Sequence, residues 1–110
     1  MAVEKIAGPL SPLDYRIRFA IGHRRLIEVT YQRFTRLAEP HDYGRQANTD
    51  RLLIYQLRGP ARPAHSSTGW RWLDLPKIES LTVLDDEFPG SRGTRQQHHH
   101  NWDVLYARVK

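Results

Sequence analysis

Cysteine is absent from this 110-residue chain, so a disulfide framework and a thiolate metal site are both excluded. The chain also lacks any run of about 18 apolar residues, the length needed to span a bilayer. The first ten residues carry Glu4 and Lys5 and lack the long apolar core of a signal peptide. These absences favour a reducing compartment over secretion, and we expect a soluble, cytoplasmic protein with no membrane partner.

Lysine is scarce as well. Of the 17 basic residues only Lys5, Lys77 and Lys110 are lysines, which leaves 14 arginines, and the net charge is +5 with a pI near 10.0. Arginine can grip a phosphate with two hydrogen bonds and can stack on a base, whereas lysine is a hydrated point charge. The bias predicts an anionic partner, and codon usage in a GC-rich genome is the alternative explanation.

A helix is predicted over residues 12–25. Ser11 before a proline is typical of a helix start, because the serine side chain caps free N–H groups and proline is tolerated in the first turn. Leu13, Ile17 and Ile21 then recur at helical spacing and form one apolar stripe, which we expect to pack on a sheet.

Short strands are predicted after residue 26. From Leu26 apolar and polar residues alternate, which is typical of a half-buried strand. A second strand over residues 35–39 is predicted to end at Pro40, because proline cannot donate to a sheet ladder. Residues 43–50 have the composition of a polar loop. Further strands are predicted at Arg51–Arg58, Trp70–Leu75, Leu81–Leu84 and 102–110, with a loop over 59–69 and a flexible basic and histidine-rich segment over 89–101.

One helix and five or six short strands are too few for a two-sheet sandwich. The predicted fold class is therefore mainly β (α+β), with the N-terminal helix followed by a small, strongly bent sheet that closes into a barrel over residues 26–88. With 39% hydrophobic residues, the chain is expected to build one modest core and to form a single domain over residues 1–110.

Four segments in order resemble the WYL domain family, the small Sm-like β-barrel modules of bacterial regulators and defence-associated proteins. They are Ala20–Tyr31, Arg36–Pro40, Leu52–Leu57 and Arg71–Ile78, trailed by Leu81, Leu84 and Phe88. Of the tripeptide that names the family only Leu52 is present, with Asp50 and Arg51 in place of Trp and Tyr. The winged-helix domain that usually precedes such a module is also missing, so the resemblance implies a stand-alone sensor or a module that acts through a partner.

The resemblance implies that Arg36, Arg71 and Lys77 line a surface for a nucleic acid or a nucleotide-like ligand. Arg45 and Arg51 are added as neighbouring cations. The alternative for the arginines is internal pairing with an acid, for which Glu39, Asp74 and Glu79 are the candidates. The remaining arginines, Arg92 among them, are expected to be general electrostatic background.

Aromatic side chains on strands offer faces on which unpaired bases stack. Tyr31, Tyr43 and Trp72 are the predicted stacking residues, whereas Tyr55 and at least one tryptophan are expected in the core.

No catalytic constellation is present, and we predict a non-enzyme without a cofactor. His41 with Asp42, and Ser66 or Ser67 near His65, lack a positioned third group. The run of residues 98–100, three adjacent histidines, is a weak metal site and reads as a polar linker.

The leading hypothesis is a regulatory binding module that recognises a single-stranded nucleic acid or nucleotide-like anion and acts on a protein partner or on its own assembly. The alternative is a structural or protein-interaction barrel, for instance a homodimer formed through an edge strand, whose arginines are dispersed and individually paired.

Overall fold

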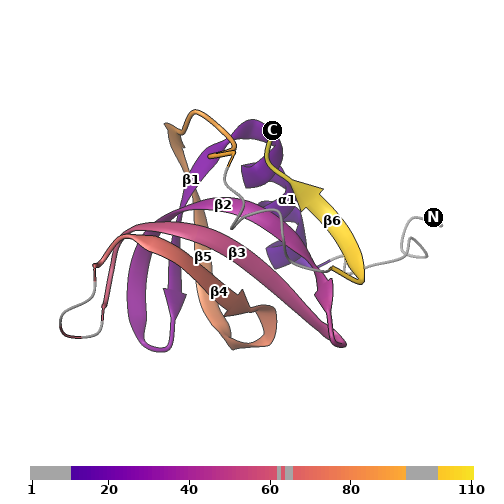
Figure 1. Cartoon of the computed structure of the whole chain (residues 1–110), viewed down its shortest axis with the longest axis horizontal. Coiled ribbons are helices and arrows are strands. Elements are labelled where there is room, and N and C mark those ends of the chain that lie inside the picture. The colour runs from indigo at the N-terminus through magenta and orange to yellow at the C-terminus, as the bar shows by residue number, and fades with distance from the viewer. Residues whose placement is uncertain (1–10, 62, 64–65, 94–101) are drawn as a thin grey trace.

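The computed structural model of the chain describes residues 11–61, 63, 66–93 and 102–110. Helix α1 (Pro12–His23) is followed by strands β1 (Arg25–Tyr31), β2 (Phe34–Gln46), β3 (Thr49–Arg58) and β4 (Gly69–Asp74). A short 3-10 helix, η2 (Leu75–Lys77), leads into β5 (Ile78–Glu87), and β6 (Val104–Arg108) is the last strand (Figure 1).

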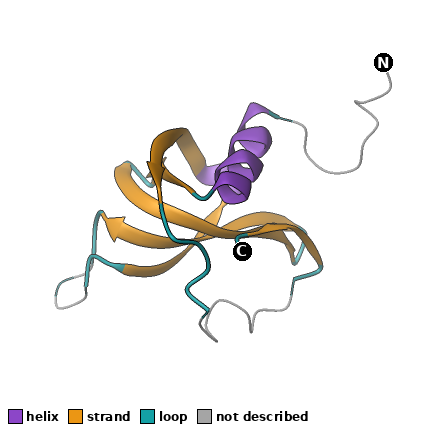
Figure 2. Cartoon of the chain, turned by 90° about the horizontal axis from the view of Figure 1, so that it is seen from above, coloured by secondary structure: helices purple, strands orange, loops and turns teal. Residues whose placement is uncertain are grey.

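Helix α1 forms where its caps predict. The Ser11 side chain accepts a hydrogen bond from the backbone N–H of Asp14 at 3.1 Å, and Arg24 ends the helix in the left-handed conformation with φ 54°. The apolar stripe that includes Ile17, Ala20 and Ile21 is buried, and α1 lies on one side of the curved sheet (Figure 2). The predicted packing of this helix on a sheet is confirmed.

Strand β2 is the spine of an antiparallel sheet. One edge of β2 pairs with β3 from Leu37 to Gln46, whereas its other edge pairs first with β1 and then, from Asp42 to Arg45, with β6. The strand order is β4-β3-β2-β1-β5, with β6 placed on β2 beyond the end of β1. The long β2 and β3 curve together across the whole molecule in Figure 1.

The prediction that the second strand ends at Pro40 is wrong, and so is the predicted loop over 43–50. β2 runs through Pro40, which lies where pairing with β1 has ended and pairing with β6 has not begun. The ladder with β3 also shifts register between Pro40 and Asp42. An interrupted ladder tolerates a residue that has no N–H to donate.

The mainly β fold class with an N-terminal helix is confirmed, and all six strands belong to one strongly bent sheet. The predicted closure into a barrel over residues 26–88 is wrong. Within the described residues the edge strands β4 and β5 do not pair with each other and are joined through η2, so the sheet stays open. Register shifts in the β1–β5 and β2–β3 ladders supply the bend. In the part of the chain that the structure describes, no helix is long and apolar enough to cross a membrane.

Gly44 is a position where only glycine fits. A Cβ atom there would contact the backbone oxygen of Val104 and would lie 2.7 Å from the ring of Trp102. Gly22 in helix α1 is the opposite case, because nothing lies within 4 Å of a Cβ built on it.

Gly44→Ala is expected to push β6 away from β2 and to lower the free energy of unfolding by about 1–3 kcal/mol, the cost typical of overpacking. Gly22→Ala is the matched control and should leave stability unchanged or raise it by about 0.5–1 kcal/mol, because alanine favours a helix over glycine. Urea denaturation followed by circular dichroism measures both changes. Equal stabilities for the two variants would contradict the packing of β6.

Candidate functional site

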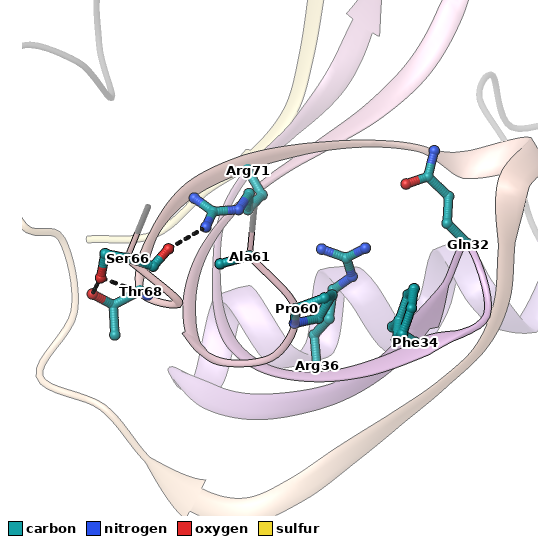
Figure 3. A pocket seen from close by; sticks show the side chains of 8 residues that line it. All are labelled: Gln32, Phe34, Arg36, Pro60, Ala61, Ser66, Thr68 and Arg71. Atoms are coloured by element: carbon teal, nitrogen blue, oxygen red, sulfur yellow. Dashed lines mark hydrogen bonds between the residues drawn. The ribbon is translucent and has the colours of Figure 1, made fainter. Parts of the chain in front are cut away.

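An open pocket of about 650 Å³ lies at one end of the sheet, between the β1–β2 turn and the β3–β4 loop. Figure 3 shows it from close by, with Arg36 and Arg71 on different strands around the same opening. The other lining side chains come from the turn and the loop and are Gln32, Phe34, Pro60, Ala61, Ser66 and Thr68.

Arg36 is the most unusual residue of this pocket, because it is only 7% exposed and none of the acids among the described residues binds it. Its Nη1 donates to Oε1 of Gln56 at 3.0 Å, and its Nη2 donates to the carbonyl of Tyr31 at 3.3 Å. Its Nε is buried and has no hydrogen-bond partner in the described part of the chain, and the guanidinium lies 5.6 Å from the centre of the Tyr31 ring. Within the described residues Arg36 is thus a nearly buried cation held by neutral groups only.

The three acids that were candidates for pairing with Arg36 or Arg71 are engaged elsewhere. Glu39 binds Arg92 and His41. Asp74 pairs with Arg51, and Glu79 accepts from a backbone N–H of the β1–β2 turn. Among the described residues, internal neutralisation of these two arginines is therefore not found.

Arg71 adds a second positive charge to the same pocket. Its guanidinium donates to the carbonyls of Trp70 and Ser66, at 3.0 and 3.1 Å, and to no carboxylate of the described chain. Burial and the repulsion from Arg71 lower the pKa of Arg36, although its contact with Tyr31 offsets part of this. A bound anion would relieve both effects, because it would neutralise the two cations and replace the water that burial removed.

Phe34 and Gln32 belong to this pocket although sequence reasoning assigned neither of them to a site. The Phe34 ring is 55% exposed beside Arg36. Gln32 and Arg33 form a two-residue hairpin turn in which both residues have positive φ, 53° and 72°. Such turns normally carry Asn-Gly, so the pocket rim is made of residues that the backbone does not favour there. Strand parity was the available signal, since Phe34 and Arg36 are two residues apart.

Two of the predicted stacking residues are in the core, which corrects their placement on a binding surface. Tyr43 is fully buried and its hydroxyl donates to Asp14 at 2.7 Å, so burial and that contact raise the pKa of Tyr43. Tyr31 is 6% exposed, and its hydroxyl accepts from the backbone N–H of Asp74 at 3.1 Å. Tyr31 therefore supports Arg36 from within the core. Tyr55, predicted to be core, is only half-buried.

The remaining predicted residues gather around acids at the other end of β3. Arg51 donates to Asp74 at 3.0 Å and lies 4.6 Å from the centre of the Trp72 ring, and Lys77 is 3.9 Å from the same Asp74. Arg45 pairs with Asp50 at 3.4 Å. Arg51 and Gln56 are five residues apart on β3, a distance of roughly 17 Å. The structure therefore separates Arg45, Arg51, Trp72 and Lys77 from Arg36 and Arg71.

Arg92 is not electrostatic background, and this prediction is corrected. Its Nε and Nη2 each donate to a different oxygen of buried Glu39 at 2.9 Å, and its guanidinium lies 3.6 Å from the centre of the Tyr55 ring. His41 is fully buried and its Nε2 is 3.0 Å from Glu39 Oε1. A carboxylate can only accept, so Nε2 of His41 carries the proton. The contacts of Arg92 with Glu39 and Tyr55 therefore attach the segment after β5 to strands β2 and β3.

The geometry gives the rejected catalytic pairs no new support. His41 and Asp42 are both fully buried in β2 and bind different partners, Glu39 and Arg108. The Ser66 hydroxyl contacts that of Thr68 at 2.8 Å. His65 and the run of histidines over 98–100 lie outside the described residues. The described part of the chain contains no group of three or more metal-ligating side chains.

The chain was compared with protein-family models, curated proteins and solved structures, and no match was found in any of the three.

Lowering the pH should reduce the free energy of unfolding, because it protonates the carboxylate of Glu39. Burial raises the pKa of its carboxyl, but hydrogen bonds from His41 and Arg92 and the charge of Arg92 outweigh burial and leave the pKa below its ordinary value. A group whose pKa is lower in the folded state contributes stability above its unfolded pKa of about 4.3 and loses it as the pH falls further. Glu39→Gln should cost about 1–3 kcal/mol at pH 7, and this difference from wild type should shrink towards pH 3. Urea denaturation at both pH values measures it; a difference independent of pH would contradict the carboxylate role.

Proposed function

We propose that the chain is a binding module for a phosphate-bearing ligand, a nucleotide or a short single-stranded nucleic acid segment, which enters the pocket of Arg36 and Arg71. The observation that carries this proposal is the nearly buried Arg36, which has neutral partners only within the described residues. An apolar side chain would make the fold more stable at such a position, because a buried cation without a counter-charge costs free energy. A role in anion recognition accounts for its presence.

The donors of the pocket suit a phosphate group. A guanidinium has five N–H donors, and two hydrogen bonds are formed by Arg36 with the described chain. Arg71 faces the same opening from β4, so a phosphate between the two would be held from two sides. The exposed ring of Phe34 at the rim gives a base a surface to stack on. The resemblance to the WYL family implies the same two arginines.

The test is fluorescence anisotropy of a labelled single-stranded oligonucleotide titrated with the protein at several salt concentrations. Arg36→Ala/Arg71→Ala should weaken binding strongly and should make the slope of log Kobs against log salt shallower by about 1.4, the value expected for two lost phosphate contacts on a single strand. Such a change reports on the charges that touch phosphate.

The matched control is Arg16→Ala/Lys110→Ala, which removes two exposed cations outside this pocket and causes the same change in net charge. This control should keep most of the affinity and nearly the wild-type slope. Equal effects of the two double variants would mean that only net charge matters and would refute the assignment of the pocket.

A second candidate function is protein interaction through an open sheet edge. Two observations favour it: the outer edge of β5 has no partner strand among the described residues, and six arginines of the same residues are paired with acids. A free edge of this kind can add a strand from another chain, including a second copy. This use of the edge is compatible with an anion in the pocket.

Light scattering after size-exclusion chromatography tests the second candidate. A homodimer predicts a mass near twice the 12.9 kDa of the chain, falling towards the monomer value on dilution. Val83→Pro in β5 should abolish that dimer. Hydrogen-bonded and non-hydrogen-bonded pairs alternate along the β1–β5 ladder, which turns the backbone N–H of Val83 to the free edge, and proline has no N–H to donate there. A monomer at every concentration would leave only a different protein as the partner of this edge.

A further inference from the structure

Gln56 is a fully buried amide near the end of β3, and its side-chain oxygen and nitrogen both bind groups at or beside the pocket. Its Oε1 accepts from Nη1 of Arg36 at 3.0 Å. Its Nε2 donates to the carbonyls of Pro60 and Ser67, at 3.0 and 2.7 Å. One side chain thus holds the arginine and both ends of the loop that joins β3 to β4.

We propose that Gln56 is the positioning residue of this pocket: it fixes Arg36 and the β3–β4 loop as one unit and leaves the charge of Arg36 free for an anionic ligand. This inference rests on the proposed function, because it concerns how the same pocket recognises its phosphate.

The amide is the one functional group that meets both demands. Two backbone carbonyls need two N–H donors, and the guanidinium needs an acceptor, so an amide satisfies all three partners at once. A carboxylate at this position would neutralise Arg36 and would also turn an oxygen towards the Pro60 and Ser67 carbonyls. An apolar side chain would leave the arginine and the loop unattached.

The loop is tied to the second arginine as well. Nη2 of Arg71 donates to the carbonyl of Ser66, one residue before the carbonyl that Gln56 binds. Arg36, Gln56, the loop ends and Arg71 therefore form one continuous set of hydrogen bonds around the pocket, so a ligand that pulls on either arginine acts on the loop too.

Gly59 closes this unit from behind, at φ +153°. A Cβ atom on it would lie 3.0 Å from Cδ of Gln56 and 3.1 Å from Cγ of Arg36. The backbone therefore approaches both side chains as closely as it can, which keeps their geometry fixed.

The decisive variant is Gln56→Glu, measured by the oligonucleotide titration described above. It should weaken binding by about tenfold or more, because the new carboxylate competes with phosphate for Arg36. The salt slope should become shallower by about 0.7, the value for one lost phosphate contact. A merely structural role of Gln56 would not change that slope.

Gln46 offers a matched control, because its Oε1 accepts from Nη1 of Arg51 at the same distance of 3.0 Å, away from the pocket. Gln46→Glu makes the same chemical change beside an arginine and should leave affinity and slope near wild type. Wild-type binding by Gln56→Glu, in the presence of weak binding by Arg36→Ala/Arg71→Ala, would overturn the inference and leave the proposed function standing.

Gln56→Met keeps the size of the side chain without a charge and decides the case if Gln56→Glu does not fold. It should bind more weakly with an unchanged salt slope. Amide hydrogen exchange at Thr68, whose N–H donates to Oγ of Ser66 at 3.0 Å, should be faster than in wild type even without ligand. Wild-type exchange at this amide would refute the attachment of the loop. If the wild-type protein binds no oligonucleotide, the proposed function fails, and the exchange measurement still tests Gln56 on its own.

Discussion

The structure depends on the backbone hydrogen bonds of one strand, the thirteen residues of β2, which are shared among three neighbours. No single partner satisfies the strand: β3 takes one edge, and β1 and β6 divide the other. The change of partner happens at Pro40, where the strand also bulges. The first part of β2 contributes Phe34 and Arg36 to the pocket, and the part after the register shift pairs with β6. One local irregularity therefore separates the pocket from the terminal strand.

The polar residues in the core follow the same division. Four of the six buried polar or charged side chains, Arg36, Glu39, His41 and Asp42, are on β2. Glu39 and Asp42 each receive a bidentate arginine from a distant segment, so their charges are compensated inside the protein. Arg36 alone among the charged members is matched by dipoles and an aromatic ring. Three buried acids, Asp14, Glu39 and Asp42, thus have arginine partners, whereas the buried Arg36 has no acidic partner among the described residues and lies in the wall of the pocket.

Local patterns in the sequence were sufficient for the helix and for most strands. The Ser-Pro cap and the apolar stripe located α1 within two residues, and the alternation after Leu26 located β1. The full length of β2 was not predictable from those rules, because proline and a polar composition argue against a strand unless the partners change at that point. The pairing of β6 with β2 depends on contacts between residues about sixty positions apart, which no local pattern encodes.

The candidate site was predictable in part. Strand parity and family resemblance pointed to Arg36 and Arg71, and the structure places both on one pocket. The same reasoning grouped them with Arg51, Trp72 and Lys77. Spacing along a strand does not reveal that Arg51 and Lys77 bind Asp74, at the end of β3 away from the pocket. Gln56 carried a usable signal, as a polar residue within the apolar run of β3. Its contacts with Arg36 and the loop were not accessible without coordinates.

Gly59 has a consequence for how such a pocket can diversify. Every substitution of glycine adds at least a methyl group, and here that group would press on Arg36 and Gln56 together. Position 59 therefore has no conservative replacement, unlike the rim, where Gln32 and Phe34 face open space. Under the proposed function, substitutions at the rim would change which ligand is preferred, whereas Gly59 would keep the depth of the bound anion constant.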